Sequence, residues 1–320
     1  MMQLLTAITL YMLAVARIPA MIRSKRDTVF IAGFLAGTSA LFTVPAIYTV
    51  VDPALGGRNW VKLGIHTFMV LGLWFLRRAI LSAVAPEATA GRRHLRALPL
   101  YLALVLQTVF FIATDVGPTT TNFGDSYNIE PAGALFSSMV MIFIGWICGE
   151  VAFRCIQFVP TMRGAFRVGF SMVLIGSVAG VFSSIELMLD VLSNAVPGMA
   201  SFNIHKSPYY QVLQLVPVAF VGLGLSIPAL SGRARRRRTA RWEREAMVRL
   251  KPIRDKVLAK AGLERVLEAD DAAALQDLLH RMIVEIWDAE LASGKESALT
   301  PDDRSYLLEI ERKLDLEHAD

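Results

Sequence analysis

The segment at residues 168–191, VGFSMVLIGSVAGVFSSIELMLDV, decides the fold class of this chain. It contains no basic residue, and its two acidic residues, Glu186 and Asp190, both lie near its end. A helix needs ~20 predominantly apolar residues to cross the hydrocarbon core of a bilayer. The segment is long enough, and we therefore predict that it forms a transmembrane helix.

Six other segments share this apolar character. The chain as a whole is 54% hydrophobic with a mean hydropathy of +0.46, which is too apolar for an ordinary soluble domain. We expect transmembrane helices at residues 3–21, 29–51, 60–81, 98–114, 132–153, 168–191 and 210–230. The predicted fold is an all-α bundle of seven transmembrane helices at residues 1–230, followed by a small helical domain at residues 231–320.

Positively charged residues follow every second predicted helix. With the helix ends that border them, the connections after the first, third and fifth helices and the run RARRRRTARWER after the seventh contain eighteen Lys and Arg residues, whereas the other three connections contain three. Cytoplasmic loops of membrane proteins carry the excess of Lys and Arg. We therefore expect a multi-pass protein of the cell (plasma) membrane, with its N-terminus outside and its C-terminal domain in the cytoplasm.

The two acidic residues of the segment at 168–191 lie one helical turn apart, and an ionised carboxylate inside a bilayer is costly unless it is compensated. Both could be solvated at the outer end of the helix, or they could belong to a proton relay. In a third interpretation, Glu186 faces a polar pocket open to the outside, while Asp190 is a solvated helix end. The candidate solute-binding residues of that pocket are Glu186, His66, Gln214 and Gln107.

Other polar residues of the predicted helices have simpler interpretations. Glu150 precedes Arg154 by four residues, the order that favours an ion pair along a helix. Cys148 and Cys155 are the only cysteines, and we expect both to remain thiols on the cytoplasmic side. The sequence has no metal-ligand cluster, P-loop, nucleophile elbow or kinase motif, so we expect no metal, no cofactor and no enzymatic activity.

The C-terminal domain divides sharply by charge. Residues 233–260 carry twelve basic and three acidic residues, whereas residues 261–320 carry six basic and sixteen acidic residues. Anionic headgroups attract each Lys or Arg beside a membrane by ~1 kcal/mol. The run RARRRR could also bind nucleic acid, but the predicted orientation already accounts for its charge, so no nucleic-acid partner is expected. Contact with anionic lipid headgroups of the cytoplasmic leaflet is expected from Arg235, Arg236, Arg237 and Arg238.

Three amphipathic segments predict a small helical bundle in this domain. In the first, Pro252 should start a second helical segment or kink the first, and Gly262 should end it. The third begins TPDD, which predicts Thr300 as the N-cap, Pro301 in the first turn and Asp303 completing a near capping box.

Two blocks of this domain carry a family resemblance. LKPIRDKVL at residues 250–258 and LLHRMIVEIWDAEL at residues 278–291 resemble the C-terminal domain of a family of multi-spanning actinobacterial membrane proteins. The family pattern runs roughly leucine-arginine-proline-leucine-tryptophan, then arginine-x-x-isoleucine-glutamate-isoleucine-arginine-aspartate. The chain departs from this pattern at Ile253, Arg254 and Trp287, and agrees with it at Leu250, Pro252, Arg281, Glu285, Ile286 and Asp288. The family is classed as transporters with a tail domain of unknown function, so the resemblance implies no substrate.

Two function classes therefore remain open. A transporter would bind a small solute of unknown identity in the outer pocket and use its tail for regulation, and the resemblance favours this class. A membrane sensor or scaffold would instead signal through the tail to a cytosolic protein partner of residues 240–320. An enzyme that acts on lipids is a distant third.

Overall fold

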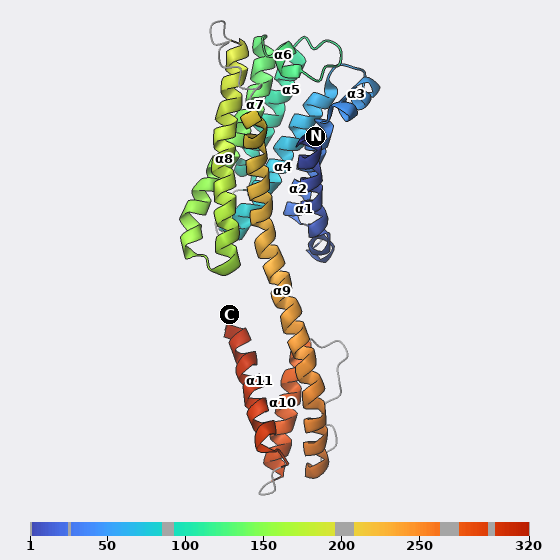
Figure 1. Cartoon of the computed structure of the whole chain (residues 1–320), viewed down its shortest axis with the longest axis vertical. Coiled ribbons are helices and arrows are strands. Elements are labelled where there is room, and N and C mark those ends of the chain that lie inside the picture. Colours follow the sequence, from blue (N-terminus) through green and yellow to red (C-terminus); the bar gives the residue numbers. More distant parts are fainter. Residues whose placement is uncertain are drawn as a thin grey trace. The chain divides into compact units, whose positions relative to one another are not determined.

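The computed structural model describes residues 2–24, 27–84, 93–195, 208–262, 275–293 and 298–319, and within these residues every regular element is helical. The all-α prediction is therefore confirmed for the described part of the chain. Figure 1 traces the helices in chain order from blue to red. They are α1 (Met2–Ser24), α2 (Thr28–Phe42), α3 (Pro45–Ala54), α4 (Trp60–Val84), α5 (Arg93–Ala113), α6 (Phe123–Tyr127), α7 (Pro131–Phe158), the short 3-10 helix η2 (Val159–Thr161), α8 (Gly164–Ala195), α9 (Pro208–Ala261), α10 (Leu275–Ala292) and α11 (Pro301–Ala319).

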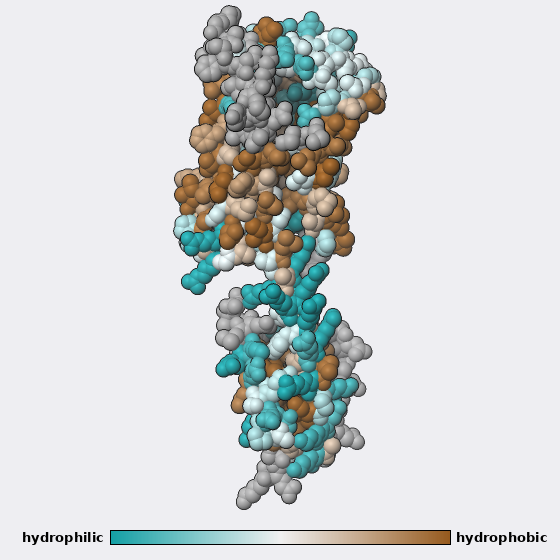
Figure 2. All heavy atoms as spheres, in the orientation of Figure 1, coloured by the Kyte–Doolittle hydropathy of each residue, from teal (hydrophilic) through white to brown (hydrophobic). Residues whose placement is uncertain are grey.

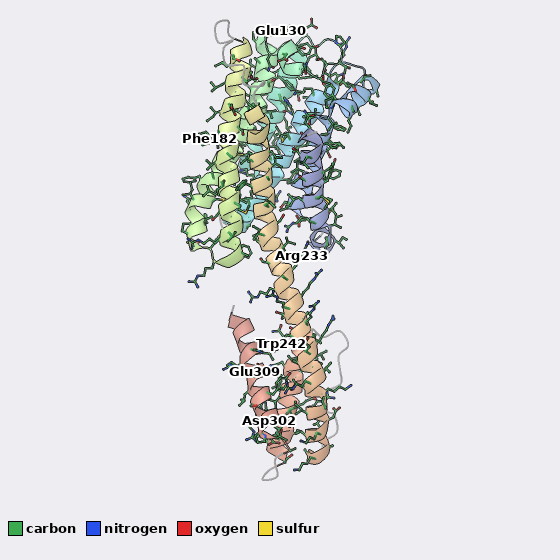
Figure 3. The ribbon with its side chains drawn as sticks, viewed as in Figure 1. Glu130, Phe182, Arg233, Trp242, Asp302 and Glu309 are labelled. Carbon is green, nitrogen blue, oxygen red and sulfur yellow. The ribbon has the colours of Figure 1, made fainter. Side chains whose placement is uncertain are left out.

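The chain divides into two compact units, Met1–Ala229 and Leu230–Asp320, and the boundary between them falls within α9. On the face of the first unit shown in Figure 2, hydrophobic residues cover the middle and hydrophilic residues gather at the ends. The outward side chain of Phe182 on α8, labelled in Figure 3, is 62% exposed. A water-soluble unit would not expose so much contiguous apolar surface.

Among the described residues, four helical segments are long and apolar enough to cross a membrane: Trp60–Ala83, Pro131–Thr161, Gly164–Ser193 and Leu215–Ala261. The pair α2 and α3 adds a fifth if the two helices count as one span. Two shorter apolar segments, Gln3–Pro19 and Ala97–Ala113, lie within α1 and α5. These lengths and compositions indicate a membrane protein, whereas the count of seven spans and their orientation remain predictions.

The segment at residues 29–51 does not form the single helix that the sequence predicted. It is divided into α2 and α3, whose axes meet at 89°. The break lies at Val44, which has extended backbone angles (φ −68°, ψ 120°) and directly precedes Pro45 at the start of α3. The proline ring clashes with a helical conformation of the residue before it, and this explains the bend.

Close helix packing in the first unit depends on small residues. A Cβ atom built on Gly169 of α8 would lie 2.5 Å from the carbonyl oxygen of Gly224 on α9, and a Cβ on Gly224 would lie equally close to the carbonyl oxygen of Gly169. Side chains at these two positions would therefore force α8 and α9 apart. Small residues bring transmembrane helices together in the same way.

The second unit has a hydrophobic core of its own, formed by α10, α11 and the C-terminal part of α9. Its most buried side chains are Ala246, Leu250, Val257, Leu279, Ile283, Ile286, Ala289, Leu307 and Ile310. Pro252 does not start a separate helix, because α9 continues through it to Ala261. Gly262 then adopts a positive φ of 62° directly after the last helical residue, as predicted.

The predicted capping box of α11 is confirmed. The backbone amide of Asp303 donates a hydrogen bond to Oγ1 of Thr300 at 3.1 Å, and the amide of Thr300 donates one to Oδ2 of Asp303 at 3.1 Å. Hydrogen bonding to Thr300 is the main cause that lowers the pKa of the Asp303 carboxyl group. Two amide groups that a helix start leaves unpaired are thereby satisfied.

Candidate functional site

The first unit contains a cavity of about 760 Å³. Residues of α1, α2, α4, α6, α7, α8 and α9 line it, and all of them precede the unit boundary. Pockets that bind small molecules usually have volumes of ~300–1,000 Å³, so the cavity is large enough for a small organic solute.

The cavity wall is polar at one end and apolar at the other. On α1, α4 and α7, polar lining residues precede apolar ones along the helix, and on α8 the only charged lining residue lies near the C-terminal end. The polar end is lined by Gln3, Thr6, Lys62, His66, Asn128, Ser137 and Asp190, and the apolar end by Leu73, Leu76, Ile80, Ile144, Ile147 and Val151.

Helix register places two of these polar residues, Asp190 and His66, at one level. A Cβ on Gly145 of α7 would lie 3.4 Å from the Cβ of Ser184 on α8, and the two helices run antiparallel. Asp190 is six residues beyond Ser184, so it lies level with the residue six positions before Gly145, within about one turn (~5.4 Å) of Phe136. The ring of His66 on α4 stacks on that phenylalanine, with 4.4 Å between the centroids. Asp190 and His66 therefore lie at similar depth in the same cavity.

The expectation that Asp190 is a solvated helix end is wrong. Its side chain is 1% exposed and lines the cavity, whereas Glu186 is half-buried and is not among the lining residues. The lining residues of α8 follow helical spacing and form a stripe along one side of the helix. They are Gly176, Ser177, Gly180, Ser183, Ser184, Leu187, Asp190 and Val191. Glu186 lies to one side of this stripe. The small and hydroxyl residues at helical spacing were the sequence signal for this stripe.

The other predicted pocket residues have different positions. His66 lines the cavity as expected. Gln107 is buried but lies away from the lining, where its Nε2 donates a hydrogen bond to Oγ1 of Thr67 at 3.0 Å. Gln214 belongs to α9, and its side chain lies outside the described residues. The four residues proposed to form one pocket are thus not all brought together in the described structure.

Lys62 is the lining residue that the sequence interpretation missed as a candidate. Its ammonium group lies 5.7 Å from the centroid of the Phe123 ring, and the described residues offer its side chain no ion pair or hydrogen bond. His66, one turn further along α4, is 6% exposed, and its Nδ1 has no hydrogen-bond partner among the described residues. Buried polar atoms are normally paired, so these two cavity-lining neighbours retain hydrogen-bonding capacity that a ligand could use.

An ion pair joins α4 and α7 toward the apolar end of the cavity. Arg77 donates two hydrogen bonds to Glu150, at 2.7 and 2.8 Å, and its guanidinium group lies 4.9 and 5.2 Å from the ring centroids of Trp74 and Trp146. The predicted pair between Glu150 and Arg154 is therefore wrong, since Arg154 instead contacts Gln157 at 3.3 Å. A bidentate ion pair between neighbouring helices is stronger than an exposed ion pair along one helix.

A buried network joins the connection before α4 to the loop before α6. The Asp52 carboxylate is fully buried and accepts hydrogen bonds from the backbone amides of Asn59 (2.9 Å) and Val61 (3.0 Å) and from Oγ1 of Thr119 (2.6 Å). Asn59 in turn accepts hydrogen bonds from the Tyr48 hydroxyl at 2.8 Å and from the Thr120 amide at 2.9 Å. The network fixes the start of α4, which carries Lys62 and His66.

The basic segment of α9 lies in the second unit. Arg235, Arg237 and Arg238 are exposed, whereas the side chain of Arg236 lies outside the described residues. Figure 3 labels Arg233 at the start of this segment. Lipid contact by these arginines remains a prediction.

Comparison with known proteins adds no identification. No protein-family model matches the chain, and neither does any curated protein or solved structure compared with it.

Proposed function

We propose that the protein is an integral membrane transporter whose solute site is the cavity of the first unit. The observation that carries this proposal is the cavity itself: about 760 Å³ between apolar helices, with a lysine, a histidine and an aspartate on its wall. Ionisable residues within membrane segments are costly and are typically retained at substrate or ion pathways. The family resemblance of the tail supports the same class.

The transporter is proposed to have seven spans, with its N-terminus outside and its second unit in the cytoplasm. The four long apolar segments, the bent pair α2–α3 and the shorter apolar segments of α1 and α5 support the count of seven, and the distribution of Lys and Arg supports the orientation. Reporter fusions test it directly. A fusion at Ser231 should report a cytoplasmic location and one within residues 131–133 an external location, and an external signal at Ser231 would exclude the arrangement.

Transport itself requires a flux measurement. Metabolite uptake and export profiles of a strain lacking the gene should differ from those of the parent, and the missing flux should return with the wild-type gene. It should not return with a Lys62→Met variant that reaches the membrane at normal levels. Identical profiles in parent and deletion strains, over a solute panel that spans charge and size, would exclude transport by this protein.

A sensor function is the second candidate, and one observation favours it. The helix α9 contributes cavity-lining residues such as Val218 and Val221 and also core residues of the second unit such as Leu250. In a sensor, solute binding would change which cytosolic protein the tail binds. A pull-down with residues 240–320 as bait, compared with the full-length protein, would identify such a partner.

A further inference from the structure

The polar end of the cavity contains a lysine and a histidine whose side chains are incompletely paired among the described residues. Lys62 lines it without an ion pair among the described residues, and Nδ1 of His66, which is one helical turn away, is buried without a hydrogen-bond partner there. Lys62 is half-buried, and removing an ammonium group from water without a counter-charge is unfavourable. An anionic group of a ligand would accept hydrogen bonds from the ammonium group and from the imidazole, and would satisfy both residues.

The rest of the cavity limits what can carry that anionic group. Below the level of His66, the wall on α4 and α7 is mainly aliphatic and contains no charged residue, as shown by Met69, Leu73, Leu76, Ile80, Ile144 and Ile147. A small hydrophilic anion would leave this surface unfilled, whereas a hydrocarbon chain or ring would bury apolar area against it. The ligand is therefore expected to be amphipathic.

The part of the wall that α8 forms limits the charge of the ligand's anionic group. Asp190 on α8 also lines the cavity, at a similar depth to His66. A doubly charged phosphate monoester would be repelled more strongly by this residue than a singly charged carboxylate. The wall thus favours a carboxylate over a dianion.

We infer that Lys62 and His66 form the head site for the carboxylate of an amphipathic solute whose hydrocarbon part occupies the aliphatic end of the cavity. This inference rests on the proposed function in treating the cavity as a solute site. The amide of Val61, the residue before Lys62, donates a hydrogen bond to Asp52, so the Asp52 network holds the backbone at the start of α4 from which both head-site residues project.

Binding to the full-length protein in phosphatidylcholine nanodiscs tests the inference by titration calorimetry, with empty nanodiscs subtracted. Octanoate is the probe, and 1-octanol, octylammonium and octyl phosphate have the same chain with other heads. Octanoate should bind at least ~10-fold more tightly than each of these, because a hydrogen bond to a charged group is worth about that factor. Affinity should also rise by ~4-fold per methylene group from butyrate to octanoate.

Variants then test whether Lys62 and His66 form the head site. Lys62→Met should weaken octanoate binding by at least ~10-fold and leave 1-octanol binding unchanged, whereas Lys62→Arg should retain most of the affinity for octanoate. Lys251→Met removes the same group from an exposed position of α9 and should behave as wild type. His66→Phe keeps the ring that stacks on Phe136 and should weaken octanoate binding in the same direction as Lys62→Met.

The inference is overturned if octanoate binds no more tightly than 1-octanol, if acetate binds as tightly as octanoate, or if octyl phosphate binds most tightly. The head-group comparison uses wild-type protein, so it tests the inference even if the variants fail to fold. Hexadecanoate incorporated in the nanodisc bilayer, compared with octanoate added from water, shows whether the carboxylate arrives from the membrane or from solution. Counterflow in proteoliposomes is measured separately. Octanoate binding without flux would refute the transport proposal and leave the head site standing. Flux without selective octanoate binding would refute the head site and leave the transport proposal standing.

Discussion

Asp52→Asn is the substitution that tests most directly whether the buried hydrogen-bond network around Asp52 stabilises the first unit. The carboxylate accepts three hydrogen bonds, two at Oδ2 and one at Oδ1. An asparagine of the same shape has one acceptor oxygen, so at least one donor loses its partner and faces an amide N–H instead. A hydrogen bond to a charged group contributes ~1.5–3 kcal/mol, and the loss of one or two such bonds should destabilise the first unit by about 2–4 kcal/mol.

Thermal unfolding in detergent measures this effect. For a unit of this size, ~1 kcal/mol corresponds to ~2–4 °C in midpoint, so the midpoint should fall by roughly 5–15 °C. Protease cleavage in the loop before α6 should accelerate in parallel, because Thr119 loses its acceptor. Asp125→Asn is the matched control, since this exposed residue of α6 carries the same charge. If the two variants unfold at the same temperature, the network does not stabilise the unit and the argument fails.

Three further predictions concern the ion pair and the second unit. Glu150→Gln should destabilise the first unit by about 1.5–3 kcal/mol, because glutamine removes the negative charge and one of the two acceptor oxygens that bind the partly buried guanidinium group. Arg154→Gln should have little effect, and equal effects would contradict the assigned pair. Thr300→Ala should cost the isolated second unit ~1 kcal/mol, measured by circular dichroism at neutral pH. The lowered pKa of Asp303 stabilises the folded state at pH values above the unfolded pKa, and this contribution is lost as the pH falls through the folded pKa; the difference from Thr300→Ala should therefore shrink below about pH 4, and a constant difference would refute the linkage. Trp287→Ala should lower the melting temperature of the same unit because the indole packs against its core, and an unchanged midpoint would make the residue a tolerated surface aromatic.

Local sequence patterns were enough where neighbours along the chain decide the structure. The apolar segments indicated the helices of the first unit, Gly262 indicated the end of α9, and TPDD indicated the capping box of α11. Each of these depends on backbone geometry within a few residues or on the length of an apolar run. Pro45 could also have indicated the bend between α2 and α3, because the restriction that it imposes on Val44 is local.

The sequence by itself thus determined the helical class, the apolar character of the first unit and, in the second unit, the end of α9 and the capped start of α11. Only the tertiary structure decided that Asp190 rather than Glu186 lines the cavity, that Lys62 belongs to its wall, and that Glu150 pairs with Arg77. Sequence spacing gives the relative angle of two residues around a helix axis, but the side of that helix that meets its neighbours depends on packing with other helices. A carboxylate near a helix end can therefore be solvated, paired or cavity-lining with the same local sequence, and the surrounding helices select among these environments by what they bring within reach.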